Sequence, residues 1–182
     1  MSQLPRFSRL HRHFILTIVL CLGLTACVGT SLVPSPYFER SIDLAHADGN
    51  IDMRMKIAEH RGYRFHLSFK YRADDQVDRA QVRELTGGTV GDQKPGVPTP
   101  VEIKISRIET EHETMVYQNI TDPILSSWGA DSLDKVIAEV ILEPGIYRLQ
   151  VRSLKSELKL LGTPIFLMVT YNPKLNPITS KN

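Results

Sequence analysis

The chain has 182 residues, 42% of them hydrophobic and 23% charged, a composition that is typical of one globular domain and excludes a disordered or fibrous protein. The formal charge is +2, but three arginines in residues 1–26 cause this excess, and the rest of the chain has 19 basic and 20 acidic residues, a net charge of −1. Near-neutrality with interspersed charges excludes nucleic-acid binding through a clustered basic face.

Residues 1–26 have the pattern of a secretory signal. Residues 1–13 carry three arginines, two histidines and no acid, and residues 14–26 form an uncharged apolar run. A helix over this run would span about 20 Å, less than the roughly 30 Å hydrocarbon core of a bilayer. We therefore expect a cleaved signal peptide rather than a permanent transmembrane or buried helix.

Residues 24–27 (LTAC) resemble the lipobox of bacterial lipoproteins. Small residues before the cut let the signal peptidase reach the bond between Ala26 and Cys27, and the Cys27 thiol accepts diacylglycerol before cleavage. Cys21 does not fit, because the preceding Leu20 is too bulky. The sequence predicts that Cys27 becomes the lipid-bearing first residue of the mature protein; the alternative is a chance cysteine in a hydrophobic run.

Lipidation of Cys27 has two further consequences. Cys21 and Cys27 are the only cysteines, so the mature domain is expected to have no disulfide, no thiolate metal site and no cofactor apart from the covalent lipid. Two or more acyl chains anchor a protein stably. Because Val28 and Gly29 follow the cysteine and no aspartate marks inner-membrane retention, the expected location in a Gram-negative cell is the periplasmic face of the outer membrane.

Three segments are expected after the signal. Residues 27–36 comprise the lipidated cysteine and a short tether, of which residues 29–36 contain two prolines and span at most about 25 Å. Residues 37–176 form the folded domain, and residues 177–182 are a C-terminal tail.

Within the domain, apolar residues recur with the period of two that is typical of β-strands. The run 63–71 alternates aromatic or aliphatic residues with polar ones, and 165–171 is apolar throughout, as expected of a central strand. His60 to Gly62 are expected to form a hairpin turn between the predicted strands 51–57 and 63–71. The predicted strands are 51–57, 63–71, 101–105, 136–142, 147–151 and 165–171.

The intervening segments fit connections. Residues 73–86 are expected to form a short helix or a polar crossover, 87–100 a loop, and 126–135 a loop or one helical turn. Six to eight strands without regular strand–helix alternation favour two packed sheets. The predicted fold is all-β, an immunoglobulin-like or Greek-key β-sandwich of about seven strands, preceded by a cleaved signal peptide.

Residues 142–147 (LEPGIY) resemble the tyrosine corner of Greek-key sandwiches. In that motif a tyrosine entering a strand turns its hydroxyl back to the backbone of the preceding connection. Pro144 and Gly145 supply the turn, and Tyr147 is expected to staple the fold rather than to contact a ligand.

No motif indicates an enzyme. The chain lacks a nucleophile elbow, a P-loop and a dinucleotide-binding glycine pattern. The histidines of the mature chain lack zinc-site spacing, and they are expected to be solvated: His46, His60, His66 and His112. Two acidic clusters could bind a cation or act as paired carboxylates, but solvated turns are expected: Asp74, Asp75 and Asp78, and Glu109, Glu111 and Glu113.

Trp128 is the sole tryptophan and lies between Ser127 and Gly129. An aromatic residue on a loop is a reasonable recognition anchor. The alternative is a plug that closes the open end of the sandwich.

The motifs together resemble those of a family of small bacterial lipoproteins that carry an immunoglobulin-like domain of unknown function. The resemblance covers roughly residues 40–174 and rests on the lipobox, a G-x-P-x-P segment before a V-x-I-x-I strand (96–105), and L-x-P-G-x-Y-R-L-x-V (142–151). It implies a fold and no catalytic residue. A weaker resemblance is to the outer-membrane lipoprotein of the type VI secretion system.

We expect a non-enzymatic interaction module, anchored to the membrane by lipid, that binds a protein partner in the envelope through loops or a sheet edge. Alternatives are an immunity lipoprotein against a toxin that acts in the periplasm, and a structural part of an envelope or secretion machine. An enzyme or small-ligand carrier is the remaining class. That class would need a deep pocket lined by at least two of His66, His112 and the acidic clusters.

Overall fold

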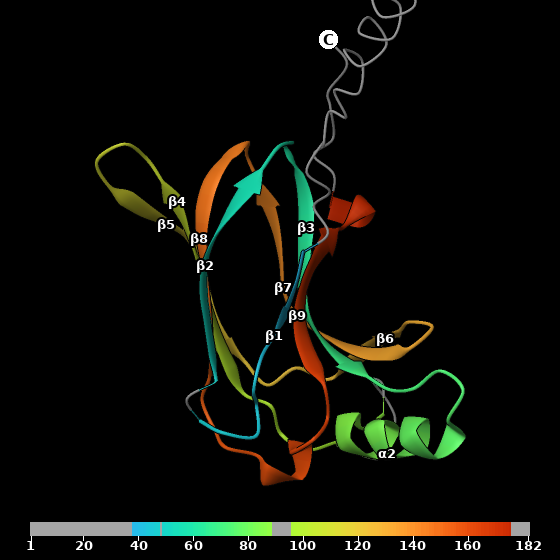
Figure 1. Cartoon of the computed structure of the whole chain (residues 1–182). Helices are drawn as coiled ribbons and strands as arrows, with labels where there is room; N and C mark the ends of the chain where they lie inside the picture. Colours follow the sequence, from blue (N-terminus) through green and yellow to red (C-terminus); the bar gives the residue numbers. More distant parts are fainter. Residues whose placement is uncertain (1–37, 48, 89–95, 176–182) are drawn as a thin grey trace, which may run out of the picture. The chain divides into compact units, whose positions relative to one another are not determined.

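A computed structural model describes residues 38–47, 49–88 and 96–175. They form two antiparallel β-sheets packed face to face (Figure 1). One sheet has five strands in the order β1-β9-β3-β7-β6 and the other has four in the order β2-β8-β4-β5. The strands are β1 (Phe38–Ser41), β2 (Asn50–Ile57), β3 (Arg61–Lys70), β4 (Val101–Ile108), β5 (Glu113–Thr121), β6 (Leu125–Trp128), β7 (Ser132–Leu142), β8 (Gly145–Ser153) and β9 (Ile165–Tyr171).

The centre of the sandwich follows the strand order of an immunoglobulin domain. In that fold the second and fifth strands are neighbours in one sheet, and the third and sixth are neighbours in the other. If β2 is counted as the first strand and β5 is left out, β3 and β7 are the second and fifth strands, and β4 and β8 are the third and sixth. Both pairs are neighbours here, as in the immunoglobulin fold. The outer strands differ, since β2 pairs with β8 and β9 pairs with β3. The predicted all-β sandwich is confirmed, with nine described strands where about seven were predicted.

The core lies between the sheets and follows the alternation in the sequence. On β3 the residues Tyr63, Phe65, Leu67 and Phe69 are buried, and they face the buried Val101, Ile103 and Ile105 of β4 and Leu149 and Val151 of β8. Residues 165–171 form a strand that pairs on one side with β1 and on the other with β3, so the predicted central strand is confirmed.

The predicted hairpin at residues 60–62 is wrong. β2 and β3 belong to different sheets, so their connection crosses the sandwich instead of joining two paired strands. Periodicity identifies a strand but not its partner, because a strand alternates in the same way in either sheet. Tyr63 marks the corner: its hydroxyl donates to the carbonyl of Glu59 at 2.9 Å.

Three strands were not predicted, namely β1, β5 and β6. Residues 126–135, expected to be a loop or a helical turn, instead hold most of β6 and the start of β7. β5 is exposed along most of its length, so it has no hydrophobic alternation to detect. The helix α2 (Gln76–Thr86) falls within 73–86 and begins where the Asp75 carboxylate accepts from the amides of Val77 and Asp78.

Tyr147 has the geometry of a tyrosine corner. It lies near the start of β8, and its buried hydroxyl donates to the carbonyl of Glu143 at 2.9 Å. Burial is the main cause that raises the pKa of Tyr147 above its usual value of 10.0. The hydroxyl is therefore neutral and available as a donor at physiological pH.

Tyr147→Phe should lower the free energy of unfolding by about 1–2 kcal/mol, because it leaves the Glu143 carbonyl without that donor. Urea unfolding monitored by fluorescence measures the loss. Tyr117→Phe is the matched control, since no hydrogen bond of its hydroxyl occurs among the described residues, and it should change stability by less than about 0.5 kcal/mol. Equal losses in the two variants would contradict the role of Tyr147.

Candidate functional site

The predicted lipidation and cleavage residues, Ala26 and Cys27, lie outside the described residues, as does the tether 27–36. In the part of the chain that the structure describes, no helix is long and apolar enough to cross a membrane.

Of the four histidines among the described residues, three are exposed and paired with a neighbouring carboxylate. The side chain of His46 contacts Asp43 at 2.8 Å, that of His60 contacts Glu143 at 3.2 Å, and that of His112 contacts Glu109 at 2.9 Å. The pairs lie on separate turns. Within residues 38–47, 49–88 and 96–175, no group of three or more His, Cys, Asp or Glu side chains could hold a metal ion.

The first acidic cluster serves local structure. Asp75 caps α2 and forms an ion pair with Arg72, and the Asp78 carboxylate accepts from the backbone amide of Arg72 at 2.7 Å. Capping hydrogen bonds and the Arg72 charge hold the pKa of Asp75 below its usual value. These carboxylates therefore fix the start of the helix and do not face each other as an acid–base pair.

His66 was predicted to be solvated, and this prediction is wrong. It lies on the outer face of the five-stranded sheet, yet it is only 7% exposed, and its Nδ1 atom has no hydrogen-bond partner in the described structure. Its cross-strand neighbours, Val136 and Met168, exclude water. Burial lowers the pKa of His66 below 6.5, with Asp134 opposing the shift, so the neutral ring is favoured.

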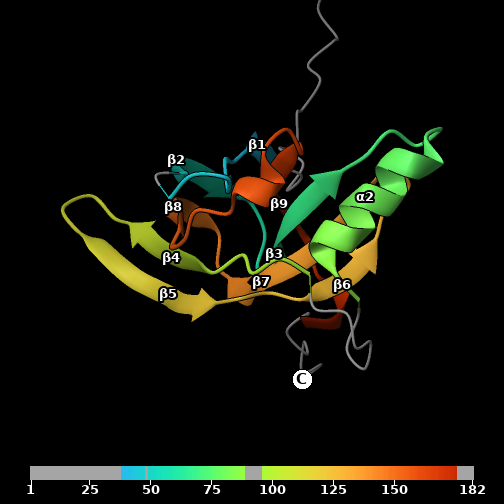
Figure 2. The same cartoon turned by 90° about the horizontal axis from the view of Figure 1, so that it is seen from below.

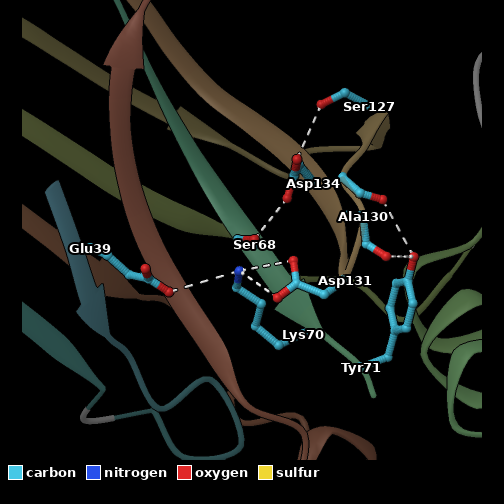
Figure 3. A network of polar contacts seen from close by, with 9 residues as sticks. Glu39, Ser68, Lys70, Tyr71, Ser127, Ala130, Asp131 and Asp134 are labelled. Carbon is cyan, nitrogen blue, oxygen red and sulfur yellow. Dashed lines mark hydrogen bonds and ion pairs between the residues drawn. The ribbon is translucent and has the colours of Figure 1, made fainter. Parts of the chain in front are cut away.

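Beside His66, a network of polar contacts ties together four strands of the same sheet (Figure 3). The Ser68 hydroxyl donates to Asp134 at 2.8 Å and the Ser127 hydroxyl donates to its other oxygen at 3.4 Å. Lys70 contacts Asp131 at 3.3 Å and Glu39 at 4.0 Å. A serine nucleophile is commonly activated by a histidine that accepts its proton. Here the Ser68 hydroxyl donates to the Asp134 carboxylate, and the Nδ1 atom of His66 has no partner in the described structure. These contacts fit a structural role, in which they hold neighbouring strands in register.

A cleft of about 740 Å³ lies between α2, residues 96–98 and the segment 157–164. Its polar lining is of mixed charge, with Lys70, Lys159, Asp78, Glu84 and Glu157. Of the groups that an enzyme or carrier was expected to gather, it contains only Asp78. His66 and His112 do not line it.

Sequence reasoning missed Lys135, which is only 2% exposed on β7. Its ammonium lies 3.4 Å from the Val97 carbonyl, 3.3 Å from the Thr99 hydroxyl and 5.4 Å from the centroid of the Phe69 ring. Burial lowers the pKa of Lys135 to about 8, and the negative charge of Asp122 opposes the shift. Lys135 lies two residues from each of the buried Leu133 and Ile137, so it is on the same face of the strand, and this spacing could have predicted its burial. The spacing was not used, because these residues lie in or beside the predicted loop.

Trp128, the candidate recognition residue, lies at the end of the edge strand β6 and is 50% exposed. It is therefore more accessible than a buried plug would be. A larger group of exposed apolar side chains lies at the opposite sheet. Met115, Val116 and Ile120 belong to β5, the edge of the four-stranded sheet, which pairs only with β4 in the described structure.

β5 is the least protected of the described edge strands, because apart from one bulge at Val116 it is long and nearly uncharged. Protected edges are short or carry charges, lysine or proline. β1 and β6 have four residues each, and β2 exposes Asp52, Arg54 and Lys56. β5 has nine residues with no lysine, proline or glycine, and its one charge is Glu113 at the start. Figure 2 shows the β4–β5 ribbon curving away from the rest of the sandwich.

Comparison with known proteins identifies a family and a fold. No curated protein matches the chain. A crystal structure of the Sulfurospirillum deleyianum protein GEBA250068378 matches with a TM-score of 0.66 at 17% identity, over 75% of this chain and 98% of that one. At this identity the likeness shows the sandwich fold alone. A family model matches residues 39–171, nearly the whole described sandwich, and the chain therefore belongs to the family described as a domain of unknown function (DUF5625).

Proposed function

We propose that this protein is a non-enzymatic interaction module that binds a protein partner in the cell envelope, anchored by the lipid on Cys27 to the periplasmic face of the outer membrane. The observation that carries the proposal is β5. It is a nine-residue edge strand with exposed apolar side chains. Exposed apolar surface and an open sheet edge are features of protein-binding surfaces.

The state of the polar side chains supports the same proposal. Many of them are engaged in ion pairs on the sheet faces. On the four-stranded sheet, Arg148 forms a bidentate pair with Asp52, and Arg152 contacts Glu102 at 2.9 Å. The Arg148 pair lowers the pKa of Asp52. Groups held in this way contribute a solvated, structured surface instead of a reactive centre.

The lipobox supplies the other half of the proposal. An anchor on Cys27 followed by the nine residues 28–36 keeps the domain within about 30 Å of the bilayer. A partner is then met at the membrane surface, where a high local concentration allows a modest interface to suffice.

The test is chemical crosslinking in intact cells, followed by purification of the lipidated protein and mass spectrometry. An unrelated lipidated protein of equal abundance is the control. The proposal expects one envelope protein to be enriched over that control and to be lost when crosslinker is omitted. Equal recovery of the same proteins with both baits would contradict it.

A further inference from the structure

The open edge β5 carries a second feature, which is a negative charge. Residues 109–122, which contain β5 and its flanks, include Glu109, Glu111, Glu113 and Asp122 but no lysine or arginine. Basic side chains contact part of this charge: Arg107 lies 3.9 Å and His112 2.9 Å from Glu109, and Arg148, already bound to Asp52, lies 3.5 Å from Glu113. At the other end, the Asp122 carboxylate accepts from the Thr99 amide at 2.7 Å, and its charge acts on the buried Lys135. The edge is therefore apolar at its centre, with three glutamates at its start and one engaged aspartate at its end.

We infer that β5 is the docking edge for an extended, basic segment of the partner, which adds a strand to the four-stranded sheet; this inference rests on the proposed interaction function. A free sheet edge offers backbone donors and acceptors that only another extended chain can satisfy along its length. The exposed Ile120 would pack on an apolar side chain of the added strand. Lysine or arginine in that strand complements the acidic flanks.

The local geometry limits where regular pairing can occur. Val116 is an extra residue in the ladder, because Met115 pairs with Ser106 and Tyr117 with Ile105. A bulge interrupts an edge, so the regular part of β5 is 117–121. Beyond it lies a depression of about 520 Å³ lined by residues 121–126 and Val136, which can accept a side chain of the added strand.

The same charge argues against a second copy of this chain as the occupant. Since regular pairing is limited to 117–121, an antiparallel pair of two copies would centre on Asn119 and place no lysine or arginine against the acidic flanks, because residues 109–122 contain none. In a parallel pair in register, Asp122 of one copy would lie next to Asp122 of the other. Like charges across a ladder are destabilising, whereas a basic strand removes the repulsion.

The test uses the lipidated mature protein, residues 27–182, in detergent micelles and three peptides of about ten residues. One alternates valine with lysine, one alternates valine with glutamate, and one is the lysine peptide with a central proline that breaks the ladder. We expect only the uninterrupted lysine peptide to bind, more weakly as salt rises. It should slow amide exchange at 117–121.

Ile120→Lys should weaken binding of the lysine peptide about fivefold to tenfold, since it removes an apolar cross-strand contact and adds a like charge. Val77→Lys makes the same charge change at a similarly exposed position on α2, 69% against 63% exposed, and should change binding less than twofold. Equal binding of the glutamate or proline peptide would overturn the inference. Protection from amide exchange that is confined to β1, β2 or β6 would also overturn the inference. Self-association of the protein that Ile120→Lys abolishes would overturn it as well.

A negative result in the peptide test and a negative result in the crosslinking test contradict different proposals. A crosslinked envelope partner together with no preference for the lysine peptide overturns the docking edge and leaves the interaction function standing. Binding of the lysine peptide with no partner enriched in cells contradicts the interaction function instead.

Discussion

Cys27→Ser is expected to abolish incorporation of radiolabelled palmitate and to leave the precursor uncut between residues 26 and 27. The serine hydroxyl does not replace the thiolate that accepts diacylglycerol, and cleavage by the lipoprotein signal peptidase follows that transfer. Each acyl chain contributes about 0.8 kcal/mol per buried methylene, so loss of the lipid removes the whole anchor. Labelling, and mass spectrometry of the N-terminal peptide, measure the two effects.

Cys21→Ser is the matched control. It makes the same chemical change six residues earlier, in the apolar run 14–26, and should leave palmitate labelling and cleavage unchanged. Palmitate labelling that survives Cys27→Ser, or that is lost in Cys21→Ser alone, would show that Cys27 does not carry the lipid.

The second large effect is expected at Lys135. Folding moves its ammonium from water to a site that is 2% exposed, where the pKa falls from 10.5 to about 8. Between these two values the unfolded chain binds more protons than the folded one, so stability rises with pH. The free energy of unfolding should increase by about 2 kcal/mol between pH 7 and pH 9.5. Urea unfolding at several pH values measures it.

Lys135→Met should remove this rise, because the variant has no group at position 135 to titrate. At pH 7 the variant loses the cost of a buried charge but also the hydrogen bonds to the Val97 carbonyl and the Thr99 hydroxyl, so the pH dependence, and not the absolute stability, is the diagnostic readout. The measurement stops at pH 9.5, where Tyr63 is protonated in the folded state, since its pKa is raised to about 12, and is mostly protonated in the unfolded chain, where its pKa is 10.0.

Lys159→Met is the control for Lys135→Met. Lys159 is an exposed lysine of the 3₁₀ turn Leu158–Leu160, and the variant should keep the rise with pH. If the rise survives in Lys135→Met, it belongs to another group, and the buried ammonium does not carry the penalty assigned to it.

The parts of the fold that were predictable are those in which one physical rule acts alone. The run 63–71 of β3 alternates apolar with polar residues and the run 165–171 of β9 is apolar throughout, so both strands were predictable. The turn at 144–147 combines a proline and a glycine, which favour a turn, with a tyrosine at the start of the next strand. In each case the local residues alone determine the result.

The parts that were missed depend on neighbours that sequence does not show. β5 is held by its backbone hydrogen bonds to β4 and keeps most of its side chains exposed, so its sequence has no hydrophobic period that would predict a strand. The polar alternation of β3 placed His66 on the outer face correctly, but Val136 and Met168 on adjacent strands exclude water there. The same cause hid Lys135, which is buried by residues 97–99 and Phe69.

The candidate site divides in the same way. Cys27 was proposed as the lipidation residue from the local sequence, whereas β5 emerged only when the strand order showed which strands are edges. Trp128 was singled out because it is a lone aromatic residue. It lies on β6, a short edge strand of the five-stranded sheet, whereas β5 is an edge of the four-stranded sheet.

The most direct test of the central claim is a photo-crosslinking amino acid placed at position 120 of the full-length protein in living cells, with position 77 as the control. Both positions are exposed, on β5 and α2 respectively. The account predicts a covalent adduct with a second envelope protein from position 120 and none from position 77. Adducts of equal yield from both positions, or from position 77 alone, would contradict it.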